Sequence, residues 1–222
     1  MRNENNNTLI VGDLHIPFEH ENYMSHCIEI KKKYNCKRII FIGDIQDAHA
    51  ESYWETNPDG HSAGAELNLV KNKLKEWQKA FRKEDVYVVI GNHDAIPSRK
   101  MFSSGLSRNW IKGFPEVYET PTWKYSLEWK FDSVLYTHGQ GCANLCNSIL
   151  NQRMSIVVGH FHTKFEILYN SSEKDLLWGM YVGCGISPSK YAFEYAKYNV
   201  KRPVLGCGVV IDGKPYLEPM SL

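Results

Sequence analysis

Five short apolar runs, rich in valine and isoleucine, each end at a glycine or threonine that is followed at once by side chains able to bind metal. An apolar run of this kind is typical of a buried strand, and glycine allows the chain to turn sharply and approach a ligand closely. We therefore expect an α/β fold with its site on loops at the strand ends. The runs and the residues that follow them are Thr8–Val11 with Gly12-Asp13-Leu14-His15, Ile39–Ile42 with Gly43-Asp44-Ile45-Gln46-Asp47, Val86–Ile90 with Gly91-Asn92-His93-Asp94, Val134–Thr137 with His138-Gly139, and Ile156–Val158 with Gly159-His160-Phe161-His162.

The candidate ligands in these five loops are oxygen and imidazole donors, and none is a thiolate. Such donors suit Mn, Fe or Zn better than they suit a soft-metal centre. They are too many for one ion, so they favour two ions that share a carboxylate, about 3.5–4 Å apart, as in hydrolytic two-metal sites that clamp a phosphate. The candidates are Asp13, His15, Asp44, Asp47, Asn92, His93, Asp94, His138, His160 and His162.

Each motif taken alone has a plainer explanation. Turns favour Gly, Asn and Asp for backbone reasons, and short motifs often match by chance. His160 and His162 alone could mark a strand edge with one buried and one exposed face. The ordered set of five, each behind a strand-like run, favours a shared site.

Taken together and in order, from residue 12 to residue 162, the five motifs resemble those of the calcineurin-like metallophosphoesterase superfamily, including its small phage and bacterial members. The resemblance implies a four-layer α/β fold, in which a β-sandwich flanked by helices carries a dinuclear site at its strand ends. Manganese is the favoured metal, with iron, zinc and nickel left open. The implied ligands are Asp13, His15 and His162 for one ion, Asn92, His138 and His160 for the other, and Asp44 as the bridge between them.

The resemblance also implies catalytic roles for two residues that would not bind metal. His93 would face the scissile phosphate and would stabilise charge or protonate the leaving oxygen. Asp47 would orient His93, as a supporting carboxylate fixes an imidazole tautomer.

Two departures concern the substrate. The protein-phosphatase branch has an arginine after the second aspartate of the second motif, and here that position is Ala48. Asp94 stands where that branch commonly has glutamate. Both argue against a Ser/Thr protein phosphatase. The missing arginine, together with the presence of His93 and the full set of metal ligands, favours a phosphodiester or nucleotide-type substrate.

Three other functions stay open. A phosphomonoesterase or protein phosphatase would cleave simple monoesters better than diesters. A nuclease would need a groove lined with the Lys and Arg of residues 71–83 and 99–108, and its binding would depend strongly on salt. A binding scaffold without catalysis is disfavoured, because no ligand of the pattern is missing.

The length of 222 residues favours a single domain, 1–222, with a polar tail at 1–7. The formal net charge of +1 gives no global attraction to nucleic acid or membrane. Its six cysteines form no CxxC pair, so we expect reduced thiols. We find no apolar signal segment and no run of about 18 apolar residues. These features predict a cytoplasmic protein without membrane partners. The family resemblance implies that it acts on a small phosphorylated substrate, with a nucleotide or a nucleic-acid end as the candidates.

Periodicity predicts helices over Glu19–Tyr34, Ser62–Arg82 and Pro97–Ile111, with Ser62 as an N-cap. The middle helix has an apolar face formed by Leu67, Val70, Leu74, Trp77 and Phe81. Later strands are expected at Trp123–Phe131, Ser133–Thr137, Ser155–Val158, Phe165–Tyr169, Leu176–Val182 and Val204–Ile211.

The long loop Ala48–Gly64 leaves the second motif directly and is a candidate specificity element. It supplies three candidate substrate-binding residues: His49, Tyr53 and Trp54. The aromatic pair could stack on a nucleobase. The alternative is that Tyr53 and Trp54 cover an edge of the core.

Overall fold

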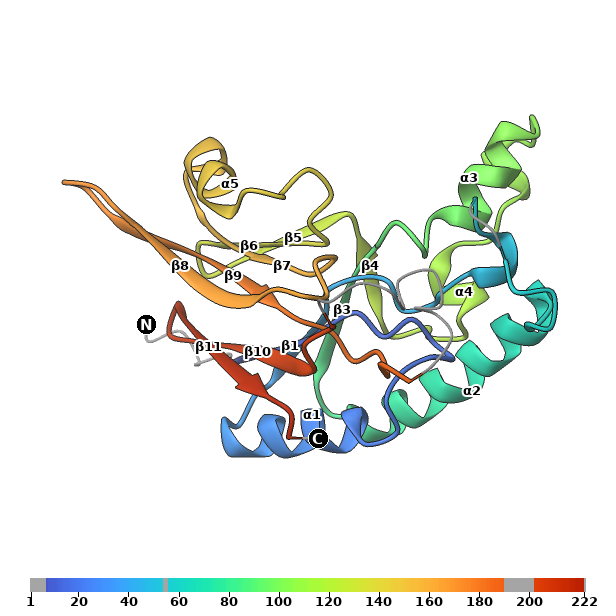
Figure 1. The fold of residues 1–222 in the computed structure, drawn as a ribbon, viewed down its shortest axis with the longest axis horizontal. Helices are drawn as coiled ribbons and strands as arrows, with labels where there is room; N and C mark the ends of the chain where they lie inside the picture. The colour runs from blue at the N-terminus through green and yellow to red at the C-terminus, as the bar shows by residue number, and fades with distance from the viewer. Residues whose placement is uncertain (1–6, 54–55, 190–201, 222) are drawn as a thin grey trace.

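The computed structural model describes residues 7–53, 56–189 and 202–221. Two β-sheets face each other, and helices cover the outer face of each sheet (Figure 1). The predicted four-layer α/β arrangement is therefore confirmed. Within the described residues, no helix combines the length and the apolar character needed to cross a membrane.

The first sheet has six strands in the order β11-β10-β1-β2-β3-β4. Strands β1 to β4 pair in parallel, so the carboxyl ends of β1, β2 and β3 lie along one edge of the sheet. The strands are β1 (Thr8–Val11), β2 (Arg38–Phe41), β3 (Asp85–Val89), β4 (Lys124–Ser126), β10 (Gly206–Ile211) and β11 (Lys214–Pro219).

The second sheet has five strands in the order β5-β6-β7-β9-β8. Its central strands β6, β7 and β9 are parallel, and the outer strands β5 and β8 are antiparallel to their neighbours. The strands are β5 (Glu128–Phe131), β6 (Val134–Thr137), β7 (Ser155–Val158), β8 (Phe165–Ser171) and β9 (Leu176–Val182).

A dry core joins the two sheets and fixes how their strand ends meet. Ile10 and Ile40 of the first sheet belong to the same buried cluster as Tyr136, Val157 and Met180 of the second. All five side chains are fully buried. Because this core holds the sheets face to face, loops after β1, β2 and β3 can meet loops after β6 and β7.

Helices α1 (Tyr23–Lys33) and α2 (Ala63–Ala80) pack on the outer face of the first sheet, and α5 (Leu145–Gln152) packs on the second. The ring of Trp77 on α2 meets Phe41 edge-on at 5.3 Å between ring centroids. The predicted cap of α2 is confirmed, since the Ser62 hydroxyl accepts a hydrogen bond from the Ala65 N–H at 3.3 Å.

The remaining elements are short: η1 (His49–Glu51), α3 (Ile96–Ser103), η2 (Arg108–Trp110) and α4 (Phe114–Val117). The helix expected over Pro97–Ile111 was wrong in its second half. Helix α3 ends at Ser103 and is followed by Gly105 at φ +80°, a left-handed conformation that closes a helix.

Two further boundaries differ from expectation. Helix α1 begins at Tyr23 rather than at Glu19. The expected strand Trp123–Phe131 is two strands, β4 and β5, that belong to different sheets. Leu127 between them is 72% exposed, which is consistent with the chain leaving one sheet and entering the other there.

Candidate metal centre

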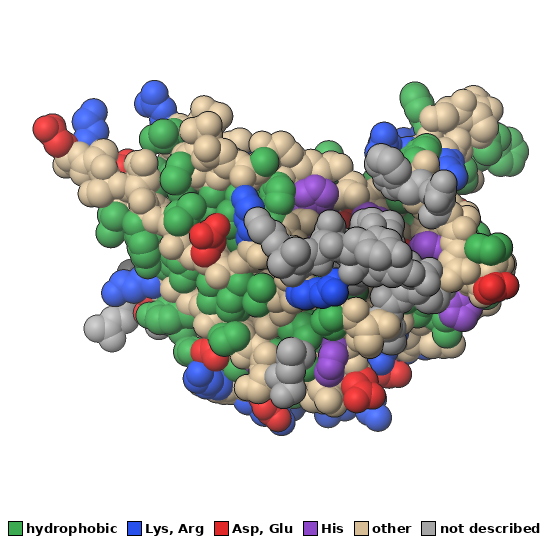
Figure 2. Space-filling view, viewed as in Figure 1, with side chains coloured by type: hydrophobic (Ala, Val, Ile, Leu, Met, Phe, Trp, Pro, Cys, Tyr) green, Lys and Arg blue, Asp and Glu red, His purple; other side chains and the backbone are tan. Residues whose placement is uncertain are grey.

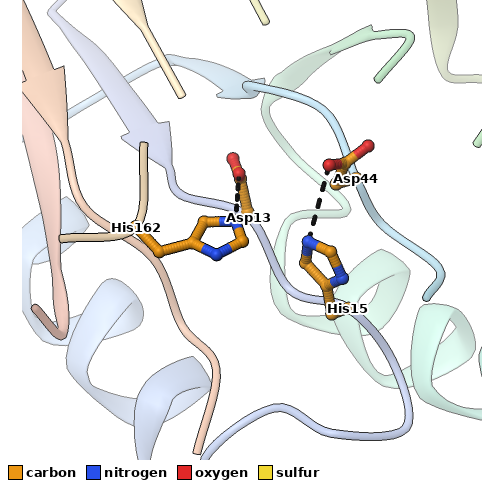
Figure 3. Close-up of side chains that lie close together, drawn as sticks. All are labelled: Asp13, His15, Asp44 and His162. Atoms are coloured by element: carbon orange, nitrogen blue, oxygen red, sulfur yellow. Dashed lines mark hydrogen bonds and ion pairs between the residues drawn. The ribbon is translucent and has the colours of Figure 1, made fainter. Parts of the chain in front are cut away.

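One group of candidate ligands gathers where β1, β2 and β7 end. Ligand atoms of Asp13, His15, Asp44 and His162 lie within 4.8 Å of one another. The His162 Nε2 atom is 2.9 Å from Asp13 Oδ2, and the His15 Nε2 atom is 3.5 Å from Asp44 Oδ2 (Figure 3). The four side chains come from three loops, so the sandwich brings them together.

A second group lies on the other side of Asp44. Ligand atoms of Asp44, His138 and His160 are within 4.8 Å of one another. The His138 Nε2 atom is 3.0 Å from Asp44 Oδ2 and 2.9 Å from Asn92 Oδ1. The structure thus brings together all seven side chains expected as ligands, and Asp44 belongs to both groups.

Several donor atoms in these groups lack the partners that buried polar atoms normally have. Asp13 Oδ1 and His15 Nε2 are buried and have no hydrogen-bond partner in the part of the chain that the structure describes. If the His138 ring is neutral and its Nδ1 donates to the Ile42 carbonyl at 3.1 Å, its Nε2 lone pair faces two oxygen acceptors. Buried polar atoms are rarely left unpaired, and a cation in each group would satisfy them. The donor set therefore fits divalent metal ions.

The electrostatics of the groups favour the same conclusion. Burial alone would lower the pKa of His138, but the charges of Asp44 and Asp13 raise it to about 9. Burial alone would raise the pKa of Asp44, but His138 and His15 hold it well below its usual range. The carboxylates therefore create a negative potential that raises the pKa values of His15 and His138 and retains protons on these two imidazoles. Metal binding would release those protons, because a ligating imidazole must be neutral.

Two glycines allow the loops to close around the carboxylates. A Cβ atom at Gly91 would lie 2.1 Å from Asp44 Oδ1, and one at Gly159 would lie 2.4 Å from Asp13 Oδ1. No side chain can be accommodated at such distances without movement of the carboxylate. The glycines that begin the third and fifth motifs are thus explained by close approach to the ligands.

Three of the ligands have strained backbones. His15, Asp44 and His160 adopt positive φ angles of 47°, 48° and 65°. Left-handed conformations of residues other than glycine cost free energy and gather at functional sites. Their concentration here agrees with a site whose side chains must converge.

His93 lies beside these groups and is held by its own hydrogen bonds. Its backbone N–H donates to Asp44 Oδ1 at 2.8 Å, and its Nδ1 lies 2.6 Å from the Asp47 carbonyl oxygen. Burial and the nearby charge of His15 lower its pKa. Nδ1 therefore carries a proton toward the carbonyl, and Nε2 is the atom that can exchange a proton with a substrate. The side chain is 29% exposed, so a substrate can reach it.

Asp47 supports two histidines by different means. Its carboxylate lies 2.6 Å from His15 Nδ1 and only 4.0 Å from His93 Nδ1. The expectation that Asp47 orients His93 thus applies chiefly to its backbone carbonyl, while its carboxylate orients His15. A carboxylate on Nδ1 leaves His15 Nε2 for a metal. Ligand atoms of His15, Asp47 and His93 form a third close group, which these hydrogen bonds already explain.

Asp94 has a structural task that the motif pattern did not reveal. It is 2% exposed and accepts hydrogen bonds from the Ile45 N–H at 3.0 Å, the Gly91 N–H at 3.0 Å and the Tyr118 hydroxyl at 3.1 Å. It therefore ties the third-motif loop to the loop that carries Asp44. Tyr118 lies far along the chain, outside every motif, so only the structure shows this partner.

The three substrate-binding candidates in the loop after the second motif have different surroundings. His49 is tied within the loop, because its Nε2 accepts a hydrogen bond from the Asn57 N–H at 2.9 Å. Tyr53 is 57% exposed, so the alternative that it covers the core is wrong. Trp54 lies outside the described residues. Glu66 on α2 fixes the loop by accepting hydrogen bonds from the backbone of His49 and Ala50.

The fold and the site define an α/β sandwich protein with Asp/His clusters, of a kind that binds divalent metals, at its strand ends. Residues 7–195 match the family model of the calcineurin-like phosphoesterases, and the chain belongs to this family. The family resemblance seen in the sequence motifs is confirmed. No curated protein matches the chain in sequence.

Several solved structures are similar to the chain at low identity, each with a TM-score below 0.5. Vacuolar protein sorting 29 of Cryptosporidium parvum is 14% identical, with a TM-score of 0.49 and 98% of each chain covered. A nuclease of Pseudomonas putida, MPE, is 13% identical, with a TM-score of 0.39 over 96% of this chain and 87% of the other. The Escherichia coli phosphoesterase Yfce is 14% identical, with a TM-score of 0.43 over 92% and 87%. These likenesses establish no shared substrate.

Proposed function

We propose that the chain is a dinuclear metal-dependent phosphoesterase that hydrolyses phosphodiester or nucleotide-type substrates. The observation that carries the proposal is the position of Asp44 in both ligand groups. Manganese is the favoured metal, and iron, zinc and nickel remain open. When bound, two such ions would neutralise charge on the phosphoryl group and activate water.

The chain's own residues supply positioning and proton transfer. The His93 N–H holds Asp44 Oδ1, which leaves Oδ2 for the ligand groups. The Asp47 carboxylate sets the tautomer of His15, and the Asp47 carbonyl holds the ring of His93. In its doubly protonated form, His93 would donate the Nε2 proton to the leaving oxygen and keep the Nδ1 proton on the Asp47 carbonyl, and general acids of this kind accelerate such a step about 10²–10⁴-fold.

The proposed preference for diesters rests on the residue after Asp47. Ala48 is buried, with a left-handed backbone, and carries no cation. A monoester dianion has one more charge to neutralise than a diester anion, so a site without this added cation favours the diester. We also propose a cytoplasmic location, because all six cysteines are unpaired, and a small phosphorylated partner rather than a membrane.

Metal analysis and a substrate panel test the proposal together. The chain would be loaded with Mn²⁺, Fe²⁺, Zn²⁺ or Ni²⁺, desalted and analysed by mass spectrometry for bound metal. Rates would be measured on p-nitrophenyl phosphate, bis-p-nitrophenyl phosphate and the p-nitrophenyl ester of thymidine 5′-monophosphate. We expect two ions per chain and faster cleavage of the two diesters. One ion or none contradicts the dinuclear site, and faster monoester cleavage contradicts the diester preference.

A further inference from the structure

The segment that follows the third motif stands out from the body of the protein. It comprises α3, η2 and the residues joining them to Lys112, and we call residues 96–112 the α3–η2 arm (Figure 1). The arm begins three residues after His93. Every residue from 102 to 110 is exposed. The base of the arm at Ile96 therefore follows the third motif directly in the chain, and the exposed residues extend outward from it (Figure 1).

The arm exposes large apolar side chains that the fold does not use. Trp110 is 82% exposed, Phe102 is 74% exposed and Leu106 is 48% exposed. Tyr53 from the neighbouring loop adds a ring that is 57% exposed and lies 5.6 Å from the Arg99 guanidinium. Single exposed apolar side chains need no explanation, but several large ones gathered in one short segment indicate a binding surface.

The same arm is rich in cations. It contains Arg99, Lys100, Arg108 and Lys112 and no aspartate or glutamate. Among the described residues no ion pair is found for Arg99 or Arg108, whereas Lys112 pairs with Glu116 at 2.9 Å. Figure 2 shows Lys, Arg and hydrophobic side chains together on the arm, at the upper right of the view.

The basic stretch on α2 is different, although the sequence made it an equal candidate. Lys71 and Lys75 both contact Glu119, at 3.0 and 3.3 Å, and Lys73 contacts Glu76 at 3.0 Å. Each of these three lysines is already paired with a carboxylate, and Lys71 and Lys75 share the same one. Positive charge that is available beside aromatic rings is thus a property of the arm and not of this part of α2.

A cavity of about 580 Å³ is lined in part by residues of the arm. Its lining and the outer surface of the arm would contact different parts of a nucleic acid. Its walls include Met101, Trp110 and Tyr118, and its charged lining includes Glu66 and Asp94 as well as Lys100 and Lys112. Apolar walls with hydrogen-bond acceptors suit a nucleobase, and the two lysines suit the phosphate attached to it. Arg99 and Arg108 do not line the cavity, so they would contact phosphates outside it.

We propose that the α3–η2 arm binds single-stranded nucleic acid and delivers it to the candidate metal centre. Unstacked bases stack on Trp110 and Phe102, and phosphates contact Arg99 and Arg108. This combination of rings and cations is what sequence-tolerant single-strand binding uses. The inference names the substrate of the proposed phosphodiesterase and rests on that function for the delivery step, whereas binding itself can be measured without catalysis.

The test measures binding of a fluorescent 20-nucleotide oligothymidylate to the full chain by anisotropy, in EDTA so that nothing is cleaved. Phe102→Ala with Trp110→Ala should weaken binding about 10-fold or more. Arg99→Gln with Arg108→Gln should lower the slope of log Kd against log salt by about 1.4, from about 0.7 for each phosphate contact on a single strand. A duplex of equal length should bind more weakly than the single strand.

Two controls match these changes. Lys71→Gln with Lys75→Gln removes the same charge from paired lysines, and Tyr169→Ala removes an aromatic ring that is 58% exposed on β8. Both should bind the oligonucleotide like the wild type. The inference is overturned if the wild type does not bind, if duplex binds as tightly, or if arm and control variants are affected equally.

Two further measurements distinguish nucleic-acid binding from self-association and from catalysis. If the arm were an interface between copies of the chain, light scattering would show a dimer for the wild type and a monomer for the arm variants. That result, with unchanged oligonucleotide binding, would overturn the inference. Cleavage of bis-p-nitrophenyl phosphate without oligonucleotide binding would overturn the inference and leave the proposed function standing. Oligonucleotide binding without cleavage would contradict the proposed function and leave the binding inference standing.

Discussion

The Nε2 atom of His138 lies 3.0 Å from the Oδ2 atom of Asp44. The Nε2 atom of His15 approaches the same oxygen at 3.5 Å from the other ligand group. Asp44 is 1% exposed, so this carboxylate sits between two imidazoles with almost no water. A change at Asp44 would therefore affect both ligand groups.

Replacing Asp44 by alanine should therefore reduce metal content more than any other ligand change. We expect Asp44→Ala to lose both ions, whereas Asp13→Ala and Asn92→Ala each weaken one group. Loss of a supporting residue costs up to about 100-fold in activity, and we expect Asp44→Ala to cost more than this. Metal analysis after dialysis checks this, with Asp212→Asn in the exposed β10–β11 turn as the control. Equal metal loss in Asp44→Ala and Asn92→Ala would contradict a bridging role.

His93→Ala should separate turnover from metal binding. The ring is not part of the two groups that contain Asp44, and its Nδ1 is taken up by the Asp47 carbonyl. We expect metal content close to that of the wild type and a fall in kcat of about 10²–10⁴. Parallel measurement of bound metal and kcat on one preparation gives the answer. If metal is lost in proportion to activity, His93 is a ligand.

Asp47→Asn should act mainly through His15. The Asp47 carboxylate accepts from His15 Nδ1 at 2.6 Å, and an amide in its place can present the wrong atom and disturb the imidazole tautomer. We expect metal affinity to fall about 10–100-fold, as for other supporting residues, with a smaller effect on kcat once metal is saturating. Metal titrations followed by calorimetry distinguish the two effects. A lower kcat with unchanged metal affinity would assign the carboxylate to His93 instead.

The structure brings the candidate ligands together as expected from the sequence, because each follows closely behind a buried strand. An apolar run, a glycine and a polar side chain are local features, and parallel strands then place the loops at a common edge. The contact of Asp47 with His15, by contrast, joins residues 32 positions apart in the chain and depends on two left-handed residues, His15 and Asp44. Nothing in the local pattern distinguishes His15 from His93 as the partner of Asp47.

The errors in the secondary structure have physical reasons of two kinds. Gly105 is a helix terminator that is visible in the sequence, and it outweighs the apolar periodicity around it. The division of β4 from β5 is not visible there, because both segments are strand-like and only the packing of two sheets decides which sheet each one joins. Tyr118, the partner of Asp94, lies outside every motif, so it too depends on packing.

Glu66 should make stability depend on pH. Burial, with the charges of Asp47 and Glu51, raises its pKa to about 7 although the His49 and Ala50 N–H groups oppose this. The folded state therefore holds the proton more tightly than the unfolded state, and stability falls as pH rises between about 4.5 and 7. Glu66→Gln lacks this titration, so its stability relative to the wild type should rise by about 1–3 kcal/mol from pH 5 to pH 8.

Urea denaturation of both proteins at the two pH values tests this, and comparing the differences cancels any fixed effect of the amide. Glu29→Gln on the exposed face of α1 serves as the surface control. A constant difference between Glu66→Gln and the wild type across this pH range would refute the contribution of Glu66.

Two glycine-to-alanine changes test whether the loops close around Asp44 as tightly as the structure shows. A Cβ at Gly91 would lie 2.1 Å from Asp44 Oδ1, so Gly91→Ala must displace the carboxylate. We expect a loss of about 1–3 kcal/mol in the free energy of unfolding, as for other overpacked sites, together with weaker metal binding.

Gly64 in the first turn of α2 is the matched control, because a Cβ there meets nothing within 4 Å. Gly64→Ala should stabilise the helix by about 0.5–1 kcal/mol and leave metal binding unchanged. Urea denaturation in EDTA, followed by metal titration, measures both quantities. Wild-type metal affinity in Gly91→Ala would mean that Asp44 has room to move without losing either ion, and the role of the glycine would then be confined to the turn.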